Sequence, residues 1–69
     1  MNSKGNNFNT GLVFNFRWKN NLTKTQFCKE CKISFNSFKK FENNDLTLRI
    51  NSIFKIAKYM KVHISELFC

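Results

Sequence analysis

The chain has no proline and only two glycines, Gly5 and Gly11, among its 69 residues. Folds rich in tight turns depend on these residue types, so their scarcity disfavours a β-sandwich or a similar turn-rich architecture. Lysine, phenylalanine, isoleucine and asparagine are abundant instead. A proline-free chain of this composition and length predicts one small all-α domain.

Acidic residues are also scarce, because four of them face twelve Lys and Arg, which gives a formal net charge of +8. None lies within the first 29 residues. This balance favours an anionic partner, either nucleic acid or a membrane surface. Surface binding to a membrane through a basic amphipathic helix is the weaker option, because the apolar stripes are needed for the core.

Long apolar runs and catalytic groupings are missing from the sequence as well. No run approaches about 18 apolar residues, and residues 1–11 lack the apolar segment of a secretory signal, so we expect a cytoplasmic protein without a membrane span. The single histidine, His63, stands without an acid pair or an activated nucleophile. We therefore expect neither enzyme activity nor a cofactor, and no small-molecule effector is evident.

Nine Phe, one Trp and one Tyr give this small domain an unusually large apolar area to bury. The Asn-rich residues 1–10 predict a disordered arm, and residues 11–69 the folded domain. Apolar spacing and capping residues predict five helices. We expect them over residues 11–20, 24–31, from 35 to about 43, 49–60 and 62–68.

The start of the second expected helix carries the clearest local signal. Thr23 as N-cap with Gln26 three residues later forms a capping box, and Leu22 with Phe27 forms a hydrophobic staple. Ser34 is the expected N-cap of the third helix. The residues expected to face inward are Phe27, Cys28 and Cys31, then Phe38 and Phe41, and a stripe of Ile50, Ile53, Phe54, Ala57 and Met60.

The segment LTKTQFCKECKISFNSFKKFENN (22–44) resembles the helix-turn-helix of the Cro/C1-type (XRE) family of phage repressors and bacterial transcriptional regulators. The positions in register are Leu22, Thr23, Ile33, Ser34, Glu42 and Asn43, with Phe41 in the place of a family tyrosine. The segment KIAKYMKVHISELF (55–68) resembles the following part of the family pattern. The resemblance covers about residues 12–68. It implies a compact five-helix, lambda-repressor-like domain whose second and third helices form the helix-turn-helix.

Two positions depart from the family, which usually has glycine where Lys32 and Lys61 stand. A non-glycine residue in a left-handed conformation costs on the order of 1 kcal/mol. Either these turns are wider in this chain, or the protein tolerates the strain.

Cys28 and Cys31 allow three interpretations. Structural zinc needs four ligands, and the only other candidates, His63 and Cys69, lie far along the chain without a paired motif. Redox chemistry would need Cys28 at an exposed helix N-terminus, whereas it lies inside the second helix. The resemblance favours the third interpretation, because both cysteines occupy positions where the family keeps buried small or aliphatic residues. We therefore expect both to pack as small hydrophobes and expect no metal.

The resemblance also implies that the third helix enters the major groove of a double-stranded DNA operator. The base-contacting positions are then Phe35, Asn36, Ser37 and Lys40, and the phosphate-contacting positions Lys24, Lys39 and Asn43. Asparagine suits adenine and lysine suits guanine. Phe35 either contacts a thymine methyl group or only packs against Phe38 or Ile33.

The family further implies a structural ion pair between Arg17 and Glu42. One domain of this size contacts few base pairs, so specific binding predicts a homodimer. The expected dimer surface is the C-terminal helix with nearby leucines, unless these residues only cover the base of the core; they are Ile64, Leu67, Phe68, Leu46 and Leu48. The expected function is transcriptional regulation, as a repressor. The alternative is a protein-interaction module on the same fold, such as an antitoxin or an anti-defence protein.

Overall fold

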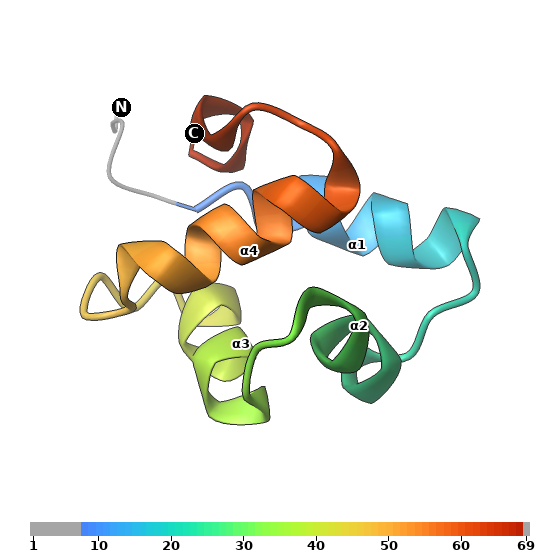
Figure 1. Cartoon of the computed structure of the whole chain (residues 1–69), viewed down its shortest axis with the longest axis horizontal. Helices are drawn as coiled ribbons and strands as arrows, with labels where there is room; N and C mark the ends of the chain where they lie inside the picture. Colours follow the sequence, from blue (N-terminus) through green and yellow to red (C-terminus); the bar gives the residue numbers. More distant parts are fainter. Residues whose placement is uncertain (1–7, 69) are drawn as a thin grey trace.

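In the computed structural model of the chain, residues 8–68 are described, and Figure 1 shows them as four α-helices followed by one short 3-10 helix. The elements are α1 (Thr10–Lys19), α2 (Lys24–Cys31), α3 (Phe35–Glu42), α4 (Ile50–Met60) and η1 (Ile64–Leu67). α4 runs across the middle of the molecule, with η1 on one side of it and α2 and α3 on the other (Figure 1). The all-α prediction is confirmed, and the expected fifth helix is one 3-10 turn.

The start of each helix in the α2–α3 pair is fixed by a side-chain cap. Thr23 Oγ1 accepts from the Gln26 N–H at 3.1 Å, and Gln26 Oε1 accepts from the Thr23 N–H at 2.9 Å, which confirms the capping box. Ser34 Oγ accepts from the Ser37 N–H at 3.1 Å. The connection between the two helices is therefore restricted to residues 32–34.

Each of the four α-helices is followed by a residue in the left-handed conformation. The residues are Asn21, Lys32, Asn44 and Lys61, with φ between 54° and 62°. After α2, the Ile33 N–H donates to Cys28 O at 3.0 Å and the Lys32 N–H to Lys29 O at 3.2 Å, which is a Schellman motif. The turns at Lys32 and Lys61 are therefore not wider than usual, and both lysines adopt the conformation in which glycine is favoured.

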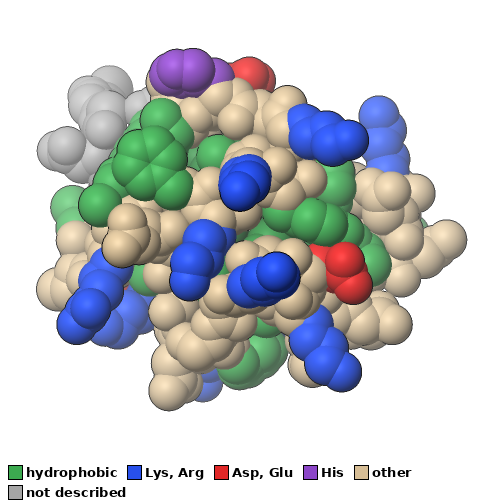
Figure 2. All heavy atoms as spheres, in the orientation of Figure 1, with side chains coloured by type: hydrophobic (Ala, Val, Ile, Leu, Met, Phe, Trp, Pro, Cys, Tyr) green, Lys and Arg blue, Asp and Glu red, His purple; other side chains and the backbone are tan. Residues whose placement is uncertain are grey.

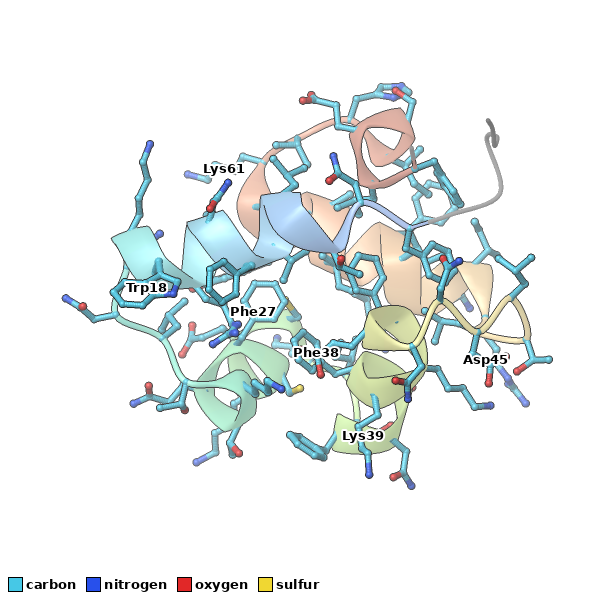
Figure 3. All side chains as sticks on the ribbon, turned by 180° about the vertical axis from the view of Figure 1, so that it is seen from behind. Trp18, Phe27, Phe38, Lys39, Asp45 and Lys61 are labelled. Carbon is cyan, nitrogen blue, oxygen red and sulfur yellow. The ribbon has the colours of Figure 1, made fainter. Side chains whose placement is uncertain are left out.

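Phe27 lies at the centre of the core. Its ring centroid lies 5.6 Å from that of Phe38, 5.8 Å from Tyr59 and 6.0 Å from Phe16, so α1, α2, α3 and α4 all contribute a ring. Figure 3 shows Phe27 and Phe38 pointing into the space between the helices. The largest fully buried side chains are Phe27, Phe38, Phe41, Ile56 and Leu67.

The buried stripe of α4 differs from the prediction. It consists of Ile53, Ile56, Ala57 and Met60. Ile50 and Phe54, which were expected in it, are each 52% exposed. The prediction was wrong because Ile50 and Phe54 lie on a flank of the helix that the rest of the fold covers only in part, whereas the omitted Ile56 is fully buried.

Phe8 belongs to the folded domain. It is 6% exposed, stacks on Phe41 at a centroid distance of 5.1 Å, and donates its backbone N–H to Asn44 Oδ1. The Asn9 N–H donates to Leu67 O at 2.7 Å. The predicted arm boundary at residue 10 is therefore wrong for residues 8–10, because burial of the Phe8 ring holds this segment on the core although the residues around it are polar. Residues 1–7 of the predicted arm lie outside the described part.

The residues expected at a dimer surface mostly close the base of the core. Leu67 is fully buried, Leu48 is 8% exposed, and Phe68 packs against Phe8. Only Leu46, at 61% exposure, remains open to a partner. Within residues 8–68, no helix has the length and apolar character to cross a bilayer.

Candidate nucleic-acid interface

The candidate interface is the outer face of α3. Its inner face carries Phe38 and Phe41, which are 1% and 0% exposed and anchor the helix in the core. At 100° per residue, Asn36, Lys40 and Asn43 lie on the opposite side of the helix. All three are exposed, as is Lys39 beside them. In Figure 3, Lys39 points away from the molecule while Phe38 points into it.

These exposed side chains combine hydrogen-bonding amides with ammonium groups. Asn36 lies in the first turn of α3, whereas Lys39 and Lys40 lie in its last turn. The first turn contains no acidic residue, so the positive end of the helix is not neutralised locally. This face can therefore offer specific hydrogen bonds at its beginning and positive charge toward its end.

Two of the predicted base-contacting residues lie at the edge of this face. The Ser37 hydroxyl lies 3.0 Å from the Ser34 hydroxyl and is part of the cap network, which leaves it only half-exposed. Phe35 is 45% exposed and its ring centroid lies 6.5 Å from that of Phe38. Phe35 thus packs on the core with one side and presents the other to solvent.

The beginning of α2 lies beside the end of α3. Lys24 Nζ lies 3.2 Å from Glu42 Oε1, with both side chains partly exposed. Glu42 therefore pairs with Lys24. The expected ion pair between Glu42 and Arg17 is not formed. The Arg17 guanidinium instead donates from Nη1 to Leu22 O at 3.1 Å and lies 5.7 Å from the centre of the Phe14 ring.

The loop after α3 is held by Asp45. Its Oδ1 accepts from the Thr47 N–H at 2.9 Å and the Thr47 hydroxyl at 2.7 Å, and these bonds hold the pKa of the carboxyl below its usual range. Asp45 stays ionised and would repel phosphate. An anionic ligand would therefore approach the first half of α3 more readily than this loop.

Sequence reasoning missed an aromatic surface on α1. Trp18 is 70% exposed and Phe14 is 50% exposed, and their ring centroids lie 6.1 Å apart. Trp18 also borders a hollow of about 360 Å³ before α2, together with Arg17 and residues 21–23. The signal was available in the i, i+4 spacing of Phe14 and Trp18, but dense aromatics on a short helix predicted core packing.

Both described cysteines are packing residues. Cys28 and Cys31 are each 4% exposed, and burial raises the pKa of the Cys31 thiol to about 12. Burial, with the nearby Glu42 carboxylate, also raises the pKa of Cys28. Neutral buried thiols are poor nucleophiles and poor metal ligands. Among residues 8–68, no group of three or more His, Cys, Asp or Glu side chains could hold a metal ion; Cys69 lies outside this range.

Comparisons with known proteins add no relative. No protein-family model, no curated protein and no solved structure matches the chain.

Proposed function

We propose that this protein is a sequence-specific double-stranded DNA-binding regulator of the Cro/C1 type, and acts as a repressor in the cytoplasm. In this proposal α2 and α3 form a helix-turn-helix in a lambda-repressor-like domain. The observation that carries it is the contrast between the two faces of α3: a fully buried phenylalanine face and an exposed face of Asn36, Lys39, Lys40 and Asn43.

Helix α3 would lie in the major groove. Asn36 would hydrogen-bond to the N6 and N7 atoms of an adenine, and Lys40 would donate to O6 or N7 of a guanine. The exposed part of the Phe35 ring is suited to a thymine methyl group. Ser37 would contribute less, because its hydroxyl already takes part in the N-terminal cap.

Phosphate contacts would come from both helices of the α2–α3 pair. Lys39 and Asn43 flank the reading face, and Lys24 opens α2, whose first turn has no acidic residue. Lys24 would have to exchange its Glu42 partner for a phosphate. Because both side chains are partly exposed, that exchange costs little.

A dimer would keep only Leu46 from the expected surface and would add the exposed apolar residues of α4. Ile50 and Phe54 lie four residues apart on α4, and Leu46 precedes that helix; each of the three is more than half exposed. A second copy covering them would double the number of base pairs contacted. Helix-turn-helix dimers bind two half-sites about one helical turn of DNA apart, so the proposed site has that spacing.

The test is selection of bound sequences from a random duplex pool. The proposal predicts enrichment of a two-fold symmetric site, with a salt slope near −0.9 per neutralised phosphate. Asn36→Ala and Lys40→Ala should each weaken binding to that site by roughly 1–3 kcal/mol. Matched controls are Asn15→Ala and Lys29→Ala, which remove the same groups from exposed positions outside α3 and outside the proposed dimer surface. Equal losses in the controls, or no enriched sequence, would refute the proposal.

A protein-interaction module is the second candidate, and the exposed Phe14 and Trp18 favour it. Apolar contacts with a protein persist at high salt, whereas contacts with phosphate fade. A partner retained by the parent chain at high salt and lost by Trp18→Ala would support this alternative.

A further inference from the structure

A groove between the end of α2 and the second half of α4 is lined mainly by lysines. It encloses about 540 Å³ and is bordered by four lysines, one acid, one tyrosine and a buried thiol; these are Lys32, Lys55, Lys58, Lys61, Glu30, Tyr59 and Cys31. Figure 2 shows Lys and Arg side chains gathered over the middle of this face, over α4 and the end of α2, with an acidic side chain beside them. The groove is a concave surface of strongly positive charge.

The backbone at two of these lysines is strained. Lys32 and Lys61 have φ values of 62° and 59°, and each follows the last residue of its helix. Glycine would relieve the strain at either position, yet both positions carry a long cationic side chain that borders the same groove. Such strain concentrates at functional sites, where a side chain serves a purpose other than folding.

Attraction to the helix ends explains only part of this arrangement. Lys55 Nζ donates to Lys32 O at 3.4 Å, in the turn that follows α2. Lys58 lies in the last turn of α4, where a positive charge is favourable to the negative end of the helix. With these two lysines in place, further cations at Lys32 and Lys61 add mutual repulsion, which an anion in the groove would relieve.

Tyr59 supplies a neutral donor to the same groove. Its ring packs edge-on against Phe16 and Phe27, so its position is fixed by the core. Burial, together with the Glu30 carboxylate, raises the pKa of its hydroxyl, which therefore remains protonated. Four lysines and one hydroxyl donor therefore border the same groove, and ammonium and hydroxyl donors match the acceptor oxygens of phosphate.

We propose that the α2–α4 groove binds the phosphate groups of a ligand, on a surface separate from the outer face of α3. The ligand class is an anion with two or more linked phosphates, from either a free polyphosphate or a single-stranded nucleic-acid backbone. The two surfaces share no residue: Lys61, at the groove, lies in the upper part of the view in Figure 3, and Lys39, on α3, lies at its lower edge. The inference does not rest on the DNA-binding proposal.

The test is a titration of the ¹⁵N-labelled full chain with inorganic triphosphate in one arm and a short single-stranded oligonucleotide in the other, followed by NMR. Amide shifts centred on residues 30–32 and 55–61 are expected in at least one arm, and the arm that binds more tightly identifies the source. Lys55→Gln with Lys58→Gln should weaken that binding by at least about tenfold. Lys19→Gln with Lys29→Gln removes the same charge from exposed positions outside the groove and should change it far less.

A second pair of variants keeps the test independent of folding. Lys32→Gly with Lys61→Gly should raise the melting temperature and still weaken triphosphate or oligonucleotide binding. Shifts spread over the whole surface, equal losses in the control pair, or unchanged binding by the glycine pair would each overturn the proposal. Duplex selection by α3 should survive in the Lys55→Gln, Lys58→Gln variant, so failure of this inference is distinguishable from failure of the proposed function.

Discussion

Replacing Lys32 and Lys61 with glycine should stabilise the protein. The left-handed conformation costs a non-glycine residue about 1–2 kcal/mol. Glycine offsets part of that gain, because its greater freedom in the unfolded chain is worth about 0.5–1 kcal/mol. The expected net gain is about 0.5–1 kcal/mol at each position, since both lysines have φ near 60° in Schellman motifs whose hydrogen bonds involve only the backbone.

Chemical denaturation and thermal melting would measure this gain. For a domain of this size, each 1 kcal/mol raises the melting temperature by about 4–8 °C. Asn21→Gly is the conformational control, because Asn21 is exposed and asparagine already tolerates this region, so its gain should be smaller. Lys58→Gln is the charge control, since it removes a cation without altering a left-handed residue. If the glycine variants gain no more than these two controls, strain at the helix ends is not the cause.

Three other predictions concern the core, the ion pair and the thiols. Phe8→Ala should lower the free energy of unfolding by about 3–5 kcal/mol in denaturant titrations, because the ring is buried against Phe41. A loss below about 1 kcal/mol would show that Phe8 is not part of the folded core. Glu42→Gln should change stability by less than about 1 kcal/mol but strengthen duplex binding in fluorescence anisotropy, because it frees Lys24; weaker binding would contradict this role. Folding raises the pKa of the Cys31 thiol from 9.0 to about 12, so the thiol loses its proton in the unfolded chain first, and the free energy of unfolding should fall between about pH 9 and 12. Cys31→Ala should show a shallower fall over this pH range. An identical slope in the parent chain and the variant would refute the effect.

The sequence predicted the local features of the fold well, because they depend on neighbouring residues. The capping box at Thr23, the bounds of α2 and the buried cysteines are all set within one or two helical turns. The errors concern contacts between distant segments. Phe8 is buried by Phe41 and Phe68, and neither partner is visible from the composition of the first ten residues.

The same distinction applies to the candidate interface. Exposure of Asn36, Lys39, Lys40 and Asn43 follows from the helical spacing around Phe38 and Phe41. The partner of Glu42 depends on how α1 and α2 pack on α3, and the resemblance alone assigned the wrong cation. The lysine groove joins residues from α2 and α4, so no single segment of sequence reveals it.

The most direct measurement is NMR mapping of the labelled protein on the duplex that selection from a random pool yields. The proposed function predicts intermolecular contacts from the side chains of Asn36 and Lys40 to base edges, and amide shifts over α3 and the start of α2. Shifts confined to the groove between α2 and α4, with the outer face of α3 unperturbed, would contradict it.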